Sequence, residues 1–141
     1  MEQEFHVGVK AIFLNERGEI LLLRKSPRHG SAGTYWDIPG GRVKQGSGIE
    51  DTLRREIREE IGARQFGITR LFDAVISNII PHKGEKGLFL VAYLCALDPG
   101  SRIVLDTEHT EFKWAGVDEA KELLSFKFPA SFLEKLDGLA P

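Results

Sequence analysis

Residues 49–61 constrain the fold most, because their apolar side chains recur with the period of an α-helix. Ile49, Leu53, Ile57 and Ile61 are spaced four residues apart, and side chains so spaced form one stripe along a helix. Charged residues of both signs cover the opposite face, where partners four residues apart attract each other. The stretch therefore predicts an amphipathic helix with one face packed on a core.

The residues that flank this helix predict its two ends. Ser47 followed three residues later by Glu50 fits a capping box, in which the serine side chain accepts a hydrogen bond from the first turn. Gly62 suits the left-handed position that ends many helices. Ser47 is therefore expected to be the N-terminal cap and Gly62 the C-terminal one.

Two glutamates of this helix are unfavourably placed for a helix that has no ligand. Glu56 and Glu60 lie at the edge of the apolar stripe, four residues apart, where like charges repel by about 0.2–0.5 kcal/mol. Both lie in the C-terminal half, where the helix dipole disfavours anions. A solvated acidic face is the alternative, but the pair indicates a missing cation. Because carboxylates are hard oxygen ligands, Mg²⁺ or Mn²⁺ is expected.

The stretch 41–63 also resembles a known family motif. The stretch is similar to the Nudix box of the Nudix hydrolases. The pattern of that motif is G-x5-E-x7-R-E-U-x-E-E-x-G-U, with U an apolar residue. Ser47 stands where the pattern has its first glutamate. The other positions match in register: Gly41, Arg55, Glu56, Ile57, Glu59, Glu60, Gly62 and Ala63.

The resemblance implies a fold and a reaction. The fold would be α/β, an α/β/α sandwich with a mixed β-sheet. The reaction would be cleavage of a nucleoside diphosphate linked to another moiety, by water attack on phosphorus with Mg²⁺ or Mn²⁺ bound. Glu56, Glu59 and Glu60 would act as metal ligands and in catalysis, the Gly40 carbonyl would join the metal shell, and Arg55 would orient the carboxylates.

Residues outside the helix are candidates for the general base and for substrate binding. Some members of the family use a glutamate from a later loop as the base, and Glu108 and Glu111 are candidates here. A surface acid is the alternative for each. The candidate substrate contacts are Arg24, Arg28, Trp36 and Lys44. Solvated charges, or a core aromatic in the case of tryptophan, are the alternatives.

Because Ser47 stands where the motif has a glutamate, a second hypothesis stays open. In it, the protein is a nucleotide-binding or regulatory module that has lost catalysis. The intact glutamates and Arg55 favour an enzyme. A purely structural domain would leave the repulsion between Glu56 and Glu60 unexplained. The substrate stays open among nucleoside triphosphates, nucleotide sugars and dinucleoside polyphosphates.

The composition limits the classes of partner. The chain has 141 residues, of which 42% are hydrophobic, so a single domain over 1–141 is expected. A net charge of −2 and a pI near 6.1 argue against binding to a nucleic-acid duplex or a membrane. Residues 1–10 lack the pattern of a signal peptide, and the lone Cys95 excludes an intrachain disulfide. A cytoplasmic enzyme with a small-molecule nucleotide substrate fits; the oligomeric state is open, with a homodimer as one alternative.

The remaining segments predict strands, turns and two further helices. Alternating apolar residues predict a strand at 5–13, whose hairpin partner is 19–25 after a turn at 15–18. A loop follows at 26–35. Strands are predicted at 66–80, 88–97 and 111–117, the first two joined through 82–87. The last helices are predicted at 118–124, capped by Asp118, and at 129–136, with Pro129 in its first turn.

Overall fold

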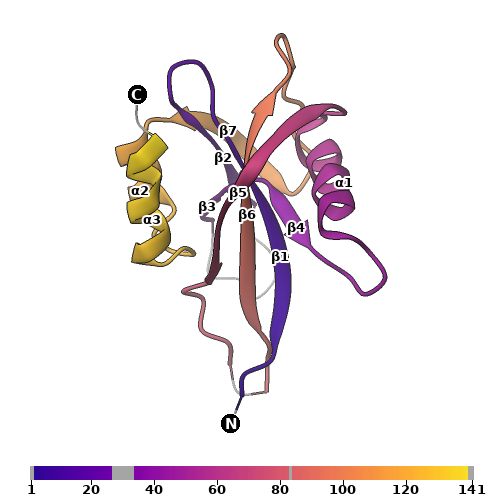
Figure 1. Ribbon diagram of the computed structural model, residues 1–141, viewed down its shortest axis with the longest axis vertical. Helices are drawn as coiled ribbons and strands as arrows, with labels where there is room; N and C mark the ends of the chain where they lie inside the picture. The colour runs from indigo at the N-terminus through magenta and orange to yellow at the C-terminus, as the bar shows by residue number, and fades with distance from the viewer. Residues whose placement is uncertain (1, 27–33, 83, 140–141) are drawn as a thin grey trace.

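Two β-sheets form the centre of the molecule (Figure 1). The computed structural model describes residues 2–26, 34–82 and 84–139. The first sheet has the strand order β4-β1-β6-β5, where β1 and β6 are parallel and the other neighbours antiparallel. Its strands are β1 (Phe5–Phe13), β4 (Gly40–Arg42), β5 (Phe66–Ile76) and β6 (Gly87–Leu97).

The second sheet is antiparallel, with the order β3-β2-β7. It contains β2 (Ile20–Lys25), β3 (Trp36–Asp37) and β7 (His109–Ala115). The short strands β3 and β4 lie between the loop predicted at 26–35 and the predicted helix, where no strand was predicted. They are two and three residues long, too short for an alternating pattern to mark them.

Helices cover the strands on both sides. The first is α1 (Ile49–Ile61), and on the other side lie α2 (Val117–Leu123) and α3 (Ala130–Leu136), followed by a 3₁₀ turn at Asp137–Leu139. The predicted α/β/α sandwich with a mixed sheet is confirmed. None of these helices combines the length and the apolar character needed to cross a membrane, within the residues described.

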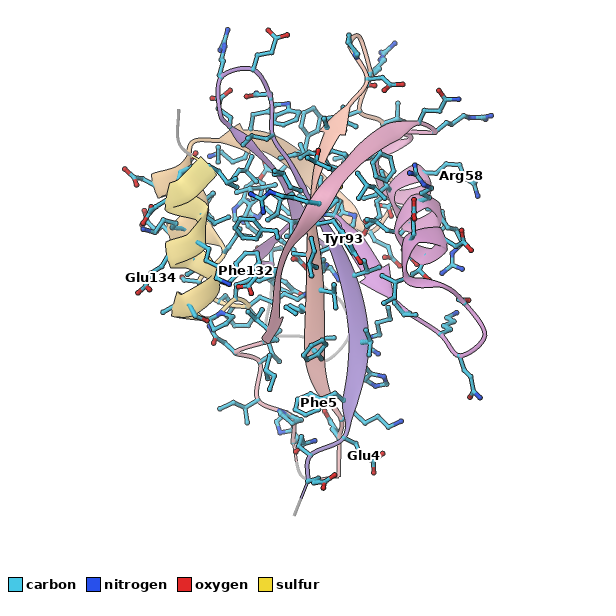
Figure 2. The ribbon with its side chains drawn as sticks, in the orientation of Figure 1. Glu4, Phe5, Arg58, Tyr93, Phe132 and Glu134 are labelled. Atoms are coloured by element: carbon cyan, nitrogen blue, oxygen red, sulfur yellow. The ribbon has the colours of Figure 1, made fainter. Side chains whose placement is uncertain are left out.

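Alternation along β2 shows why the strands need a helix on each side. Leu21 and Leu23 belong to the core cluster that contains Ile57 of α1, whereas Ile20 and Leu22 belong to the cluster with Phe132 of α3. Figure 2 shows Phe132 pointing from α3 toward the sheets and Arg58 on the outer side of α1. Because successive side chains of a strand point to opposite faces, one strand contributes to two cores.

The predicted hairpin of β1 and β2 is wrong beyond its turn. The turn forms as expected, with Gly18 at φ 76°, and Leu14 pairs with Ile20 as an isolated bridge. The strands then enter different sheets, where β1 pairs with β4 and β6 and β2 pairs with β3 and β7. An alternating pattern marks a strand but does not specify its partner.

The predicted serine cap is also wrong. Gly48 is the N-cap of α1, and no side chain caps that end. The Ser47 N–H donates to the Lys44 carbonyl within the preceding turn, and both the N–H and the hydroxyl of Thr52 donate to the Gly48 carbonyl. The predicted left-handed Gly62 is confirmed, with φ 75° and its N–H 3.0 Å from the Arg58 carbonyl.

Ser47→Ala is therefore expected to change stability little. Its side chain makes no capping bond, and surface substitutions away from special features stay within about 0.5 kcal/mol. Thermal unfolding of the variant checks this, with Thr52→Val as the comparison, because Thr52 is buried and its hydroxyl is bonded. A fall in Tm with Ser47→Ala as large as that with Thr52→Val would contradict it.

The boundaries of two strands differ from the prediction by two residues or more. β5 ends at Ile76 rather than at 80, because Asn78 turns toward the segment between α2 and α3 and bonds the carbonyls of Lys127 and Phe128. β7 spans His109–Ala115 rather than 111–117, so it begins and ends two residues earlier.

The two C-terminal helices begin one residue from where the sequence indicates. Gly116, not Asp118, is the N-cap of α2, and Asp118 lies in the first turn. Pro129 is the N-cap of α3 rather than a residue of its first turn. Both ends lack a side-chain cap, so the residue type alone does not fix the boundary.

Candidate active site

Two adjacent glycines of β4 let the carboxylates of α1 approach the sheet. A Cβ atom on Gly40 would lie 2.0 Å from the Val9 carbonyl oxygen, and one on Gly41 would lie 2.3 Å from Cδ of Glu56. Gly40 also has a φ of 151°, which L side chains rarely adopt. A larger residue at either position would push neighbouring groups apart, so the glycine pair sets the close approach of β4 and Glu56.

Glu60 is the buried carboxylate of α1, with 7% of its surface exposed. Its Oε1 accepts a hydrogen bond from the Gly40 N–H at 2.7 Å. Burial raises the pKa of Glu60 to about 8, and Asp37 and Glu56 add to the rise, whereas Lys10 and the Gly40 N–H oppose it. A cation beside Glu60 would favour its ionised form.

Arg55 lies against the other two glutamates. Its Nη2 is 3.4 Å from Oε1 of Glu56, and its Nε is 4.0 Å from Oε1 of Glu59. The helix angle alone sets Arg55 near the outer charged face, but the long side chain turns toward these carboxylates. An arginine so placed restrains two of the three glutamates.

All three glutamates line one open cavity of about 600 Å³, which we name the acidic cavity. It lies between β4, α1 and the segment that precedes β7. Five of its lining side chains are carboxylates and two are cationic. The lining residues are Lys25, Gly40, Gly41, Arg42, Glu56, Glu59, Glu60, Asp106, Thr107 and Glu108.

Asp106 and His109 belong to this site although the sequence contains no signal for them. The His109 Nδ1 is 2.7 Å from Oδ1 of Asp106, and its Nε2 is 3.7 Å from Oε2 of Glu60. The Asp106 N–H donates to the Glu60 carbonyl at 3.1 Å, which fixes this segment to the end of α1. The two segments are far apart in the chain, so no local spacing connects them.

The oxygen ligands of the acidic cavity fit a hard divalent cation. Among the described residues, no three His, Cys, Asp or Glu side chains are already gathered at metal-binding distance. Mg²⁺ commonly binds proteins through one or two carboxylates, with water and substrate phosphates completing the shell. The buried Glu60 and the partly exposed Glu56 and Glu59 could supply those carboxylates.

The two later glutamates lie in different places. Glu108 lines the acidic cavity, together with Asp106. Glu111 instead pairs across β2 and β7 with Arg24, at 2.9 Å between Oε1 and Nη1, and the Thr34 hydroxyl accepts from the same arginine at 3.0 Å. The structure therefore brings Glu108, but not Glu111, to the glutamates of α1.

Trp36 and Lys44, two further candidate substrate contacts, do not line the acidic cavity. Trp36 packs against the core on the side of α2 and α3, with the Lys113 ammonium 5.7 Å from its ring centre. Lys44 is exposed in the turn before α1. Arg28 lies outside the described residues.

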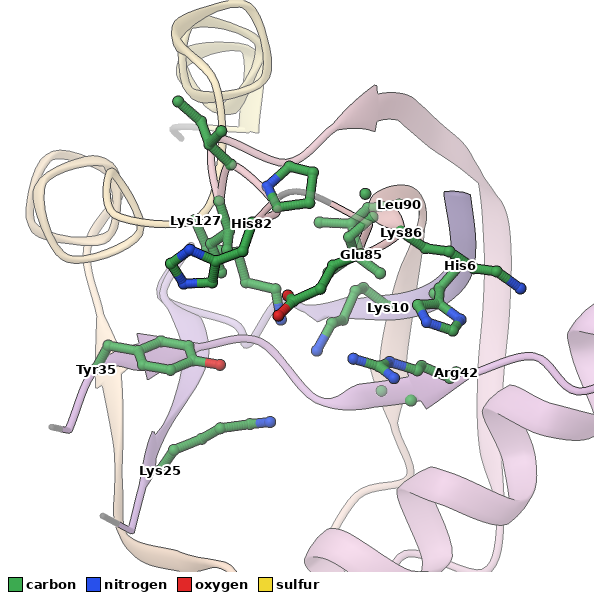
Figure 3. A pocket seen from close by; sticks show the side chains of 18 residues that line it. His6, Lys10, Lys25, Tyr35, Arg42, His82, Glu85, Lys86, Leu90 and Lys127 are labelled. Atoms are coloured by element: carbon green, nitrogen blue, oxygen red, sulfur yellow. The ribbon is translucent and has the colours of Figure 1, made fainter. Parts of the chain in front are cut away.

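A second cavity of about 390 Å³, which we name the basic cavity, adjoins the acidic one at β4. The two share Lys25, Gly40, Gly41 and Arg42. Figure 3 shows Lys10, Lys127 and Arg42 directed toward the middle of the basic cavity, with Lys25 and Tyr35 on the facing side. Two cavities of opposite charge therefore meet at the same glycines.

Comparison with known families and proteins identifies the family of this chain. The model of the NUDIX domain matches residues 4–136. The chain is 31% identical over 115 residues to the mouse bis(5′-nucleosyl)-tetraphosphatase (asymmetrical), covering 80% of this chain and 74% of that protein. It is 25% identical over 132 residues to a Wolbachia pipientis RNA pyrophosphohydrolase, covering 84% of this chain and 78% of the relative.

Solved structures agree in fold. A MutT protein from Methanosarcina mazei superposes with a TM-score of 0.76 and 24% identity, covering 99% of this chain and 95% of that one. A Caenorhabditis elegans Ap4A hydrolase gives a TM-score of 0.74 and 21% identity, covering 94% and 96%. With the family motif on α1 and the domain match across nearly the whole chain, this protein belongs to the Nudix family of hydrolases.

Proposed function

We propose that the protein is a metal-dependent pyrophosphohydrolase. It cleaves the phosphoanhydride of a nucleoside diphosphate linked to another moiety, by water attack on phosphorus. The observation that carries the proposal is the acidic cavity, where three glutamates of α1 face the glycines of β4. The tetraphosphatase and RNA pyrophosphohydrolase named above are relatives whose names describe the same class of bond cleavage.

Each residue of the site has a proposed role. Glu56, Glu59 and Glu60 hold Mg²⁺ or Mn²⁺, together with the Gly40 carbonyl. When bound, such a cation neutralises charge developing on the phosphoryl oxygens and lowers the pKa of a bound water. Glu108 is the candidate general base from a later loop, in preference to Glu111, because Glu108 lines the acidic cavity and Glu111 does not.

Arg55 orients the carboxylates, so Arg55→Ala should weaken metal binding by about 10–100-fold and lower turnover as well. The reason is its contact with both Glu56 and Glu59. Titration calorimetry with Mn²⁺ measures the affinity. Arg54→Ala is the matched control, because Arg54 pairs with Glu50 on the outer face of the same helix. Equal Mn²⁺ affinity in both variants would mean that Arg55 has no role at the site.

A non-catalytic binding module is not favoured by any contact at the site. Its support in the sequence is Ser47, which stands where the family motif has its first glutamate; the resemblance implies that this glutamate would pair with Arg55. Arg55 has carboxylate partners in Glu56 and Glu59, so the glutamate at 47 is dispensable for holding it. This supports an active enzyme.

A nucleotide panel with each divalent cation tests the proposed function. Nucleoside triphosphates, a dinucleoside tetraphosphate and a nucleotide sugar are incubated with Mg²⁺, with Mn²⁺, or with excess chelator, and the products are resolved by chromatography. Hydrolysis of at least one class that stops in chelator is expected. Nucleotide binding without hydrolysis under every condition would favour the binding module instead.

Other features of the proposal are predictions as well. The chain would act as one domain over residues 1–141, in the cytoplasm, on a small-molecule nucleotide. Binding to a nucleic-acid duplex or a membrane is not expected, given the net charge of −2. The oligomeric state, with a homodimer as one alternative, is measurable by light scattering.

A further inference from the structure

Three charged side chains form a buried cluster at the basic cavity. Lys10 of β1 and Lys127, from the segment between α2 and α3, contact the same Oδ2 atom of Asp37, at 2.9 and 2.5 Å. The exposed fractions are 5% for Lys10, 4% for Lys127 and 1% for Asp37. Both lysines also line the basic cavity, whereas Asp37 does not. The two ammonium groups therefore form a buried part of its wall.

When both lysines are protonated, the cluster carries one more positive charge than Asp37 balances. Burial alone would raise the pKa of Asp37, but Lys10 and Lys127 hold it well below its usual range, so Asp37 is ionised. Burial lowers the pKa of Lys127 to about 7, and Lys10 and Lys25 add to the fall, whereas Asp37 opposes it. A buried excess charge is unfavourable unless it gains a partner. An anion in the cavity would supply that partner.

The ammonium groups have hydrogen-bond donors for such an anion. Each has three N–H donors; Lys10 directs hydrogen bonds to Asp37 and to the Ile38 carbonyl, and Lys127 directs one to Asp37. Hydrogen bonds between an ammonium and a phosphate are among the stronger ones in proteins. The cluster can therefore bind an anion through hydrogen bonds as well as through charge.

Positive charge continues from this cluster to the acidic cavity. Lys25 and Arg42 line both cavities, and Lys86 lines the basic one. Among the described lining residues, Glu85 is the one carboxylate of the basic cavity, and it is exposed. A substrate that extends over β4 would contact the carboxylates of the acidic cavity at one end and the cationic side chains of the basic cavity at the other.

We infer that the basic cavity binds a phosphate of the substrate other than the two that form the hydrolysed anhydride, with Lys10 and Lys127 at its buried end. This inference rests on the proposed function and names its substrate class. Nucleoside triphosphates and dinucleoside polyphosphates have a third phosphate to place there. Nucleotide sugars do not, because both of their phosphates belong to the anhydride. The protein is therefore a polyphosphate hydrolase rather than a nucleotide-sugar hydrolase.

Substrate preference and one substitution test this inference by kinetics. The wild type should have a kcat/KM at least about tenfold higher for a nucleoside triphosphate or dinucleoside tetraphosphate than for ADP-ribose. Lys127→Met should raise KM for the polyphosphates about tenfold, and it should raise KM for ADP-ribose, which has no third phosphate, by a much smaller factor. Lys121→Met is the matched control, because Lys121 pairs with Asp137 outside both cavities.

Binding of inorganic tripolyphosphate tests the anion site without catalysis. Titration calorimetry in excess chelator should show binding to the wild type and about tenfold weaker binding to Lys127→Met. Lys127→Met should fold, because Asp37 keeps Lys10 as a partner, and thermal unfolding verifies this. Arg42→Gln provides a second variant, since Arg42 is exposed and also lines the cavity.

The outcomes separate this inference from the proposed function. Preference for ADP-ribose, or tripolyphosphate binding that is equal in the wild type and both variants, would overturn the inference and leave metal-dependent hydrolysis intact. Failure to hydrolyse any nucleotide would contradict the proposed function. The calorimetric titration would then still decide whether the anion site exists.

Discussion

Glu59→Gln and Glu60→Gln are each expected to lower turnover by about a hundredfold or more while the protein stays folded. When the cation is bound and Glu60 is ionised, each substitution removes one negative charge from the acidic cavity, and a catalytic cation contributes several kcal/mol of transition-state stabilisation. Glutamine at 60 keeps an oxygen that accepts from the Gly40 N–H, now bonded to Oε1. Steady-state kinetics at saturating Mg²⁺ measures turnover, and thermal unfolding verifies the fold.

Glu50→Gln is the matched control for these variants. Glu50 lies on the same helix but is exposed and pairs with Arg54, outside the acidic cavity. Its turnover should stay close to that of the wild type. Full activity in the double variant Glu59→Gln/Glu60→Gln would show that the helix carboxylates are not the catalytic groups.

Asp37→Asn should destabilise the protein by about 3–5 kcal/mol, which corresponds to a fall in Tm of roughly 10 °C or more. The substitution leaves two buried ammonium groups, on Lys10 and Lys127, without their shared carboxylate. The loss is specific to charge, because asparagine keeps an oxygen for the Ile38 N–H, which now donates to Oδ1 at 2.8 Å. Urea unfolding at pH 7 gives the free energy directly.

The exposed ion pair between Lys121 and Asp137 provides the control for Asp37→Asn. Asp137→Asn breaks an ion pair with Lys121 in which the Asp137 side chain is 56% exposed, so it should cost less than about 1 kcal/mol. Adding Lys127→Met to Asp37→Asn should restore part of the lost stability by removing one unbalanced charge. If Asp37→Asn and Asp137→Asn have equal effects, the buried cluster does not stabilise the fold.

The elements with a local period were predictable from the sequence. Leu53, Ile57 and Ile61 of the predicted stripe are fully buried on the inner face of α1, whereas Ile49, at the start of the helix, is 40% exposed. The end of that helix at Gly62 also follows the prediction, because the conformation needed there favours glycine. Its start did not follow the residue pattern. Ser47 matches a capping box by type, but the turn before α1 places Gly48 at the cap.

Contacts between distant segments were not predictable, because they depend on which strands become neighbours. Lys10 falls at an alternate polar position of β1, which suggests a solvent-facing side chain. In the structure it is buried, because both faces of that strand are covered, and its partner Asp37 is 27 residues away. Lys127 reaches the same carboxylate from 90 residues away. A single sequence gives no pattern that connects these three residues.

The candidate site likewise contains residues that local spacing indicates and residues that only the fold brings together. The spacing of Glu56, Glu59 and Glu60 lies within one helix, so the sequence alone indicates it. Asp106 reaches the cavity, and His109 reaches Glu60, on a segment that follows two long strands. Their place depends on the hydrogen bond between the Asp106 N–H and the end of α1, which has no signature in residue type.

Binding of Mn²⁺ in the absence of substrate tests most directly whether the carboxylates of α1 hold a divalent cation. Electron paramagnetic resonance measures the free ion, whose signal falls when it binds to protein. The wild type and Glu50→Gln should bind Mn²⁺ saturably and with equal affinity, whereas Glu56→Gln/Glu60→Gln should bind it at least about tenfold more weakly. Equal Mn²⁺ affinity in the wild type and Glu56→Gln/Glu60→Gln would contradict the metal site.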